Sequence, residues 1–431
     1  MTSLEVIADD VTGACDVGAE LAEAGATVRV AVDGRPAADH DDAVCVVNTQ
    51  SRAVRAAEAY ERVLRLTRRR PIDVLLKKID TALRGHLGAE LDGAIDGLGA
   101  SAAFVAPAVP AAGRVTRGGC QWFGGRRLGE TEFAADPEGP GAESSVVAVI
   151  ARESRRRTEM ISLETIRAGG LHHRTRTLMG AGVDVFVVDA ECDDDLARAA
   201  QDMLELPRPL CIAGSIGVAA VVAARMCGGN RVGAPGAVIG TPSTTGPAMP
   251  PTWSGQRTRL PAPALIICGS LHSMARAQVD ALCRADLAER IPLRDGAAAA
   301  NHAAAVARAH AALCAGRSAV VSAARLVKMA DPVARRRVER ALGQVASEVL
   351  RGGAAGALVL IGGETSYAVL REVGATELVV HGRVAPLVAA TTIACGDAVG
   401  LPLVLKGGSG GDRDTLRSLL GPLAATRQAA G

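Results

Sequence analysis

The sequence predicts an α/β protein of two domains with mainly parallel sheets, facing each other across an interdomain cleft. The chain has 431 residues, which is too long for one compact domain and suits two. Short apolar runs alternate with amphipathic stretches in both halves, as in right-handed βαβ units. From about Gly228 to Pro263 this alternation gives way to Pro, Gly, Ser and Thr, a composition typical of a linker. We therefore expect domains at 1–230 and 263–431, joined by a linker at 231–262.

The elements of the first domain follow from its periodicity. Amphipathic helices are expected where apolar residues recur at helical spacing, at 52–68, 86–97 and 193–204. Strands are expected at the short apolar runs between and around them. These runs cover 4–8, 28–32, 43–47, 74–79, 102–106, 146–150, 185–188 and 210–213.

The second domain repeats the pattern. Strands are expected at 264–268, 318–322, 357–361 and 402–405, and helices at 273–285, 298–315, 331–351 and 412–420. In open parallel sheets, ligands bind in the loops beyond the carboxyl ends of the strands. Functional residues are therefore expected directly after these runs.

Composition excludes several classes of protein. The 48 basic residues nearly balance the 46 acidic ones, and aromatic residues make up only 2%, so nucleic acid is not an expected partner. There is no signal-peptide pattern and no apolar run long enough to cross a membrane, which predicts a cytoplasmic protein. The ten cysteines include no CxxC pair, so we expect reduced thiols rather than a zinc ribbon or a disulfide framework.

Charged and hydroxyl side chains gather in the loops that follow the first-domain strands. An acid there can accept a hydroxyl proton, hold a metal or only cap the next helix, and an arginine can hold a carboxylate with two hydrogen bonds. Solvated charges at strand exits would explain the same residues without any site. The candidates are Asp10, Ser51, Arg52, Lys78, Asp80, Arg84 and Arg114, the last of these in a Pro/Gly-rich loop at 107–119.

The second domain offers glycine-rich turns instead. Glycines let backbone N–H groups approach phosphate oxygens, and a helix N-terminus adds partial positive charge, so three such turns after strands predict a nucleotide site. The chain contains no GxxxxGK[ST] and no GxGxxG in its first βα unit, which argues against a Walker P-loop and a dinucleotide fold. The turns contain Gly269 and Ser270; Gly362, Gly363, Glu364 and Thr365; and Lys406, Gly407 and Gly408, with Asp412 at the end of this last glycine-rich stretch.

Lysine is scarce in this arginine-rich chain. Its only lysines are Lys77, Lys78, Lys328 and Lys406. A compact ammonium and a planar guanidinium have different chemistry. We therefore expect Lys78→Arg and Lys406→Arg to impair activity although charge is kept, and Lys328→Arg to leave it unchanged.

Taken together, these motifs resemble the four-carbon acid sugar kinase family along nearly the whole chain. The resemblance rests on Ile7–Ala14, Lys77–Gly85, Pro107–Gly119, Gly362–Thr365 and Leu405–Gly408. It implies an N-terminal domain that binds a sugar acid and a C-terminal domain that binds ATP. Phosphate would pass to a hydroxyl of a substrate such as threonate, erythronate or 3-dehydrotetronate. The sugar-acid and ATP positions of the family fall on the candidates named above. The chain departs from the family pattern at Ala82, His272 and Gly410.

The expected mechanism needs charge neutralisation, in-line positioning and a base. Magnesium is expected to bridge the ATP phosphates, with no ligands assigned. Arg52, Lys78 or Arg84 would hold the substrate carboxylate, and the base would be one of three acids: Asp10, Asp80 or Asp412. The linker favours closure around both ligands. The alternatives are a kinase of another small hydroxy acid and a non-catalytic sensor of a sugar acid and a nucleotide.

Overall fold

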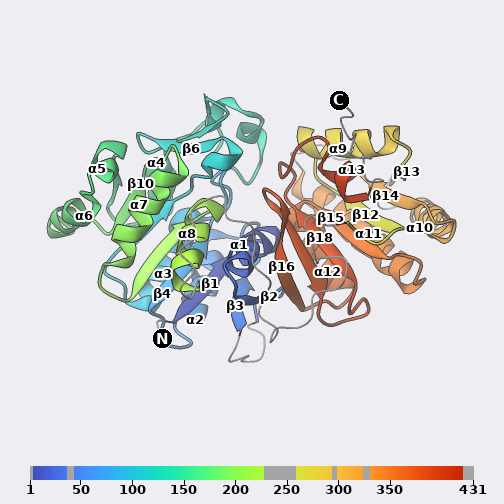
Figure 1. Ribbon diagram of the computed structural model, residues 1–431, viewed down its shortest axis with the longest axis horizontal. Coiled ribbons are helices and arrows are strands. Elements are labelled where there is room, and N and C mark those ends of the chain that lie inside the picture. The colour runs from blue at the N-terminus through green and yellow to red at the C-terminus, as the bar shows by residue number, and fades with distance from the viewer. Residues whose placement is uncertain (1–2, 36–42, 228–258, 294–298, 324–330, 421–431) are drawn as a thin grey trace, which may run out of the picture. The chain divides into compact units, whose positions relative to one another are not determined.

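The structure is a computed structural model that describes residues 3–35, 43–227, 259–293, 299–323 and 331–420 (Figure 1). The chain divides into two compact units. One comprises Met1–Gly246 and Glu377–Pro386, and the other comprises Pro247–Thr376 and Leu387–Gly431. Each unit is an α/β structure built on a mainly parallel sheet, which confirms the predicted fold class.

The sheet of the first unit has the strand order β16-β2-β3-β1-β4-β11-β5-β10-β9. All neighbouring pairs are parallel except β16 and β2, which are antiparallel. Strand β1 therefore lies between β3 and β4, and the loops after these three strands leave the same edge of the sheet. The strands are β1 (Leu4–Ala8), β2 (Thr27–Ala31), β3 (Ala43–Asn48), β4 (Val74–Lys78), β5 (Ala103–Ala106), β9 (Thr158–Ile161), β10 (Val185–Val188), β11 (Leu210–Gly214) and β16 (Glu377–Ala385).

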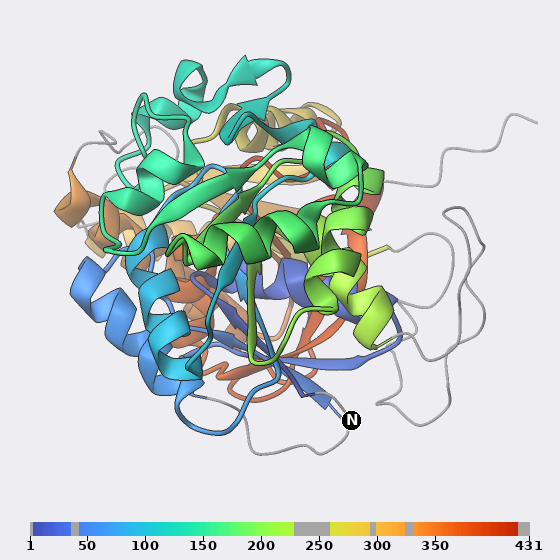
Figure 2. The same ribbon diagram turned by 90° about the vertical axis from the view of Figure 1, so that its left-hand side faces the viewer.

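Two groups of helices accompany this sheet. Helix α2 packs on α3, and α3 packs on α4, while α1 and α7 both pack on α8. Figure 2 shows α7 in green and α8 in yellow-green. The close approach of α2 and α3 needs Gly93, because a Cβ there would lie 2.5 Å from the carbonyl oxygen of Tyr60. The helices are α1 (Val11–Glu23), α2 (Ala56–Thr67), α3 (Leu87–Leu98), α4 (Val146–Ala151), α5 (Leu163–Arg167), α6 (Leu171–Gly180), α7 (Asp193–Leu204) and α8 (Ile216–Met226).

The predicted strand at 146–150 was wrong, because this segment is helix α4. Its β-branched residues favour a strand, but Ser145 caps a helix by accepting the backbone N–H of Ala148. Val146, Val149 and Ile150 then share one buried face at helical spacing. Tertiary packing and the cap thus outweigh local propensity.

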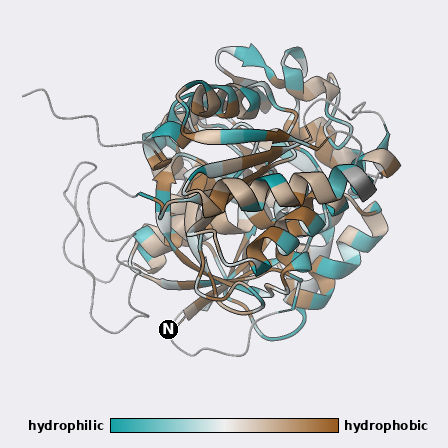
Figure 3. Cartoon of the chain, turned by 90° about the vertical axis from the view of Figure 1, so that its right-hand side faces the viewer, coloured by the Kyte–Doolittle hydropathy of each residue, from teal (hydrophilic) through white to brown (hydrophobic). Residues whose placement is uncertain are grey.

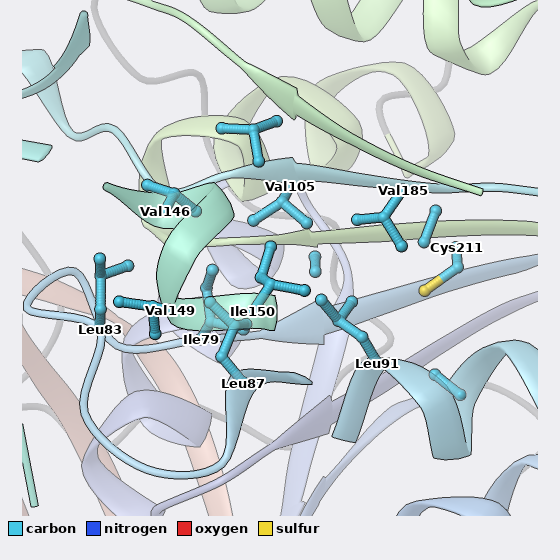
Figure 4. Close-up of a cluster of buried hydrophobic side chains, with 14 of the residues drawn as sticks. Ile79, Leu83, Leu87, Leu91, Val105, Val146, Val149, Ile150, Val185 and Cys211 are labelled. Atoms are coloured by element: carbon cyan, nitrogen blue, oxygen red, sulfur yellow. The ribbon is translucent and has the colours of Figure 1, made fainter. Parts of the chain in front are cut away.

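A buried apolar cluster fixes the loop that follows β4 (Figure 4). Leu87 and Leu91, one turn apart on α3, pack with Ile150 of α4 against the sheet residues. Ile79 and Leu83, on either side of the polar Asp80–Thr81 pair, are buried in the same cluster. Burial of such side chains contributes roughly 1.5–3 kcal/mol each. The polar residues of this loop are therefore held in place by their apolar neighbours.

The segment 107–119, predicted as a Pro/Gly-rich loop, contains the first strand of a small antiparallel sheet. This sheet contains β6 (Arg114–Arg117), β7 (Cys120–Phe123) and β8 (Arg126–Arg127). Gly118 and Gly119 make the turn between the first two strands, both with positive φ, as a tight hairpin requires. The carboxylate of Asp189 accepts both of their N–H groups, at 2.8 and 2.9 Å.

The sheet of the second unit has the order β13-β14-β12-β15-β18-β17, parallel except for the β17–β18 pair. Its helices carry both hydrophobic and hydrophilic residues (Figure 3). The four strands and four helices expected here are confirmed. The elements are β12 (Ala264–Cys268), α9 (Ser273–Arg284), β13 (Ala288–Pro292), α10 (Ala299–Cys314), β14 (Ser318–Ser322), α11 (Pro332–Arg351), β15 (Ala357–Ile361), α12 (Gly363–Glu372), β17 (Val388–Ile393), β18 (Pro402–Lys406) and α13 (Thr415–Leu420).

Strand β16 lies in the first unit, although the sequence placed its residues in a continuous domain at 263–431. Arg29 of β2 forms an ion pair with Glu377 of β16. Arg383 of β16 donates to Glu20 of α1 at 2.9 Å. The predicted linker, 231–262, and Lys328 fall largely or wholly outside the described residues. The proposed boundaries there stay a prediction.

Two further expectations can be compared with the structure. All ten cysteines lie in the described part of the chain, and none forms a disulfide. No helix within the described ranges is long and apolar enough to cross a membrane.

Candidate substrate and nucleotide sites

Strand β4 ends in two lysines that strand alternation directs to opposite faces of the sheet. Lys77 is completely buried, and its Nζ lies 2.8 Å from Oε2 of Glu90 on α3. The hydroxyl of Ser51, also completely buried, donates to Oε1 of the same carboxylate. Burial raises the pKa of Glu90, and Lys77 counteracts this. Lys77 and Ser51 thus make internal contacts that hold α3 against the ends of β3 and β4.

Lys78 lies on the other face, against the start of α1. Its Nζ donates to the carbonyl oxygen of Ile79 at 2.8 Å. A Cβ at Gly13 would lie 3.1 Å from this Nζ, so glycine is what allows the lysine to pass so close to the helix. Within the described residues, Lys78 forms no ion pair, whereas Lys77 does.

The loop after β1 holds the arginine that follows β3. Arg52 donates through Nε to Asp9 and through a terminal nitrogen to Asp10, each at 2.8 Å. Asp10 also caps α1 by accepting the N–H of Gly13 at 3.0 Å. Burial would raise the pKa of Asp9, but Arg52 and Lys77 bring it below its ordinary value. The capping role considered for Asp10 is confirmed, and it coexists with an ion pair.

The loop after β4 contains a second buried ion pair. Arg84 binds Asp80 with two hydrogen bonds of 2.8 and 2.9 Å. The Asp80 carboxylate also accepts the N–H of Ala82 at 3.0 Å. Burial would raise the pKa of Asp80, but Arg84, Arg52 and Lys78 hold it well below its ordinary value. Asp80 therefore stays ionised and is a weak acceptor for a proton.

Arg114, on strand β6 of the small antiparallel sheet, contacts the loop after β4. Its guanidinium donates to the hydroxyl of Thr81 and lies 4.9 Å from the centre of the Phe123 ring. Burial lowers the pKa of Arg114. A Cβ at Gly85 would lie 3.2 Å from Cγ of Arg52, so the loops after β3 and β4 also meet.

The structure thus assembles the seven first-domain candidates at the ends of β1, β3 and β4. Three residues that were not among the candidates also contact or adjoin this cluster: Thr81, which lies within the Lys77–Gly85 motif, Glu90 and Asp16. Asp16, on α1, is 9% exposed, and its Oδ1 is buried without a hydrogen-bond partner among the described residues. Burial is the main reason why its pKa rises to about 7. The available signal was an acid among the small and apolar residues of an otherwise buried helix.

The three glycine-rich turns of the second unit leave neighbouring strands, since β15 lies between β12 and β18. The N–H of Gly269 donates to the carbonyl of Ile361 at 3.3 Å, and that of Gly362 donates to Lys406 at 3.0 Å. A Cβ at Gly269 would overlap the hydroxyl of Thr365, and one at Gly408 would overlap that of Ser270. The predicted turns therefore form one contiguous surface of backbone.

Helix α12 begins at this surface, directly after Gly362, whose φ of 109° suits only glycine. Gly363 and Glu364 form its first turn, so backbone N–H groups and the positive end of the helix dipole are available there. Lys406 is completely buried, and its Nζ donates to the carbonyl of Gly407 at 2.9 Å. Such a surface can bind phosphate groups.

Asp412 also lies in the second unit, before α13. Its carboxylate accepts the hydroxyl of Thr415 at 2.8 Å and the N–H of Asp414 at 3.0 Å. Its carbonyl accepts from the side chain of Gln278 at 2.6 Å. These contacts order the turn that follows Gly408.

The departures from the family pattern have local explanations. His272 caps α9, because its Nδ1 accepts the N–H of Met274 at 3.1 Å, a role that serine also performs. Gly410 lies so close to Leu387 that any Cβ would overlap the carbonyl oxygen of that residue. Ala82 contributes its backbone N–H to Asp80, as described above.

Comparison with known proteins agrees with a substrate site in the first unit and a nucleotide site in the second. Residues 4–222 match a family model described as a sugar-binding N-terminal domain, and residues 265–416 match one described as a nucleotide-binding C-terminal domain. A D-threonate kinase of Bordetella bronchiseptica is 32% identical, with 95% of each chain covered. A D-threonate kinase of Salmonella typhimurium is 29% identical, with 95% of this chain and 96% of the relative covered.

More distant relatives extend the comparison. A 3-oxo-tetronate kinase of Pseudomonas fluorescens is 25% identical, with 98% of this chain and 97% of the relative covered. A crystal structure from Salmonella typhimurium LT2 has the same fold, with a TM-score of 0.76 and 19% identity over 97% of this chain and 98% of that one. The matched domains and the full-length similarity place this chain in the four-carbon acid sugar kinase family.

Proposed function

We propose that this protein transfers the γ-phosphoryl group of ATP to a hydroxyl of a four-carbon sugar acid such as threonate, erythronate or 3-oxo-tetronate (3-dehydrotetronate). The observation that carries the proposal is the pairing of two different sites in one chain. A buried cluster of acids and cations lies in the unit that matches the sugar-binding model, and contiguous glycine turns lie in the unit that matches the nucleotide-binding model. The names of the full-length relatives support the same substrate class.

Lys78 is the strongest candidate for binding the substrate carboxylate. Arg52 already holds Asp9 and Asp10, and Arg84 holds Asp80 with two hydrogen bonds. A substrate carboxylate would have to compete with these acids for either arginine. Lys78 has no such competitor among the described residues, so its ammonium can take a carboxylate as a new partner. Arg114 approaches the same face from β6 and adds a second positive charge.

On the nucleotide side, the glycine turns and the N-terminus of α12 would hold the phosphates, and Lys406 would add positive charge. Mg²⁺ is expected to accompany ATP. Within the described residues, no three His, Cys, Asp or Glu side chains cluster as metal ligands. Mg²⁺ that accompanies a nucleotide is typically held by phosphate oxygens, water and one or two carboxylates, so it does not need such a cluster. The free thiols and the use of ATP are consistent with a cytoplasmic enzyme.

The test is a coupled ADP-release screen of three- to six-carbon hydroxy and keto acids with Mg-ATP. We expect the highest kcat/KM with a four-carbon acid. As a matched control, Lys78→Ala purified in the same way should lose that turnover, which excludes a contaminating kinase. Preference for an acid of another length would favour the alternative substrate class. Binding of both ligands without turnover would favour a sensor and contradict the kinase.

A further inference from the structure

Asp16 occupies a position from which it can face the substrate cluster. It lies three residues beyond Gly13 on α1, so both residues share one face of the helix. That face is the one against Lys78, because a Cβ at Gly13 would lie 3.1 and 3.4 Å from two atoms of this lysine. The Asp16 side chain therefore extends along the same side of β4 as Lys78.

The hydrogen bonds of the neighbouring acids set Asp16 apart. Asp10 accepts from Arg52, from Gly13 and from the hydroxyl of Thr12. Both oxygens of Asp80 accept from Arg84. Asp9 leaves Oδ1 without a partner, but its other oxygen is bound by Arg52.

The side chain of Asp16 has neither an ion pair nor a hydrogen bond within the described residues, and its buried Oδ1 has no partner. A buried acceptor without a partner costs roughly 1–3 kcal/mol, which calls for an explanation such as a catalytic role.

We propose that Asp16 is the general base of the reaction and accepts the proton of the substrate hydroxyl. This proposal rests on the kinase function proposed above. The hydroxyl O–H bond breaks as its proton passes to Oδ1 of Asp16. The hydroxyl oxygen of the substrate forms the new bond to the γ-phosphorus, and the bond between that phosphorus and the β,γ-bridging oxygen breaks. ADP leaves with the electron pair, and Asp16 later releases the proton to solvent.

The charges around Asp16 suit this role. Lys78 from β4 and Arg114 from β6 favour its ionised form, whereas Asp10 and Glu20, at the start and further along α1, disfavour it. Burial outweighs all of these effects, so the pKa of Asp16 is about 7. A base whose pKa lies near the working pH combines a usable ionised fraction with real affinity for a proton. The buried thiol of Cys15, its neighbour in sequence, has its pKa raised well above the ordinary value and stays neutral.

The test is the kinetics of Asp16→Asn with the best four-carbon acid from the screen. We expect kcat to fall 100-fold or more while KM changes less than tenfold. In the unaltered protein, kcat should decline as the pH falls below about 7, and this decline should be absent from the residual activity of the variant. Asp16→Glu, which keeps a carboxyl group, should retain the decline.

Glu20→Gln is the matched control. Glu20 lies one turn further along α1, and burial also raises its pKa to about 7, but it pairs with Arg383. This variant should keep kcat at pH 8 and should keep an acid decline, moved only toward lower pH because the Glu20 charge no longer disfavours ionised Asp16.

The proposal is overturned if Asp16→Asn keeps kcat within threefold, or if it loses activity but keeps the same acid decline. Isothermal titration of the variant with the sugar acid shows that it is folded and binds. If the unaltered protein turns over none of the acids, the kinase function itself has failed, which is a separate result.

Discussion

Replacing Asp16 with Asn should stabilise the protein in a pH-dependent way. The pKa of Asp16 rises from an ordinary value of 3.8 to about 7 on folding. The folded chain therefore binds more protons than the unfolded chain between these values, and stability falls as the pH rises through this range. Above pH 7 the cost is fully expressed and amounts to about 4 kcal/mol, since one pKa unit corresponds to about 1.4 kcal/mol.

Asparagine has nearly the same shape and cannot ionise, so it avoids this cost. At pH 8 the variant should unfold about 10 °C higher than the unaltered protein, given roughly 2–4 °C per kcal/mol for a unit of this size. At pH 5 less than half of the difference should remain, because most of the folded-state carboxyl is then protonated. Thermal unfolding followed by circular dichroism at both pH values measures this. An equal shift at the two pH values, or a lower melting temperature at pH 8, would refute the argument.

Three further changes have defined outcomes. Asp80→Asn should raise KM for the sugar acid more than it lowers kcat, because Arg84 loses the carboxylate that positions it while the base remains. A 100-fold loss of kcat at constant KM would contradict this. Lys78→Arg should lower kcat/KM at least tenfold in the ADP-release assay, because the space beside Gly13 does not admit a guanidinium. Unchanged kinetics would argue against a contact between Lys78 and the substrate carboxylate. Gly408→Ala should weaken ATP binding at least tenfold in isothermal titration without changing sugar-acid binding, because the alanine methyl group would overlap Ser270. An unchanged Kd for ATP would show that this turn is not part of the nucleotide site.

Much of the fold is visible in the sequence because parallel strands buried on both faces are continuous apolar runs. Strands β1, β10, β12, β14 and β15 have the bounds that the apolar runs predict. The antiparallel strands escaped this reasoning. In β16, Leu378 and Val380 are buried while Val379 between them is partly exposed, and the apolar run ends after these three residues.

The candidate site was predicted in its location more fully than in its roles. Charges after strands β1, β3 and β4 predicted that these side chains would meet at one edge of the sheet, and the contacts of Arg52 with Asp9 and Asp10 bring two of these loops together. The sequence could not show that Ser51 faces Glu90 instead of solvent, because this depends on where α3 packs. Asp16 was overlooked because it lies within a helix and not in a loop, and its importance comes from the partners that it lacks.

Strand β16 has a consequence for dividing the chain into separate proteins. A fragment that ends before residue 247 contains every residue of the sugar-binding family model, yet it lacks the strand that pairs with β2. Its β2 would present unpaired backbone N–H and C=O groups, which promote aggregation. Arg29 and Glu20 would also lose their partners on β16. A cut at the proline-rich segment therefore does not yield two self-sufficient modules, because one strand of the first unit lies in the sequence between stretches of the second.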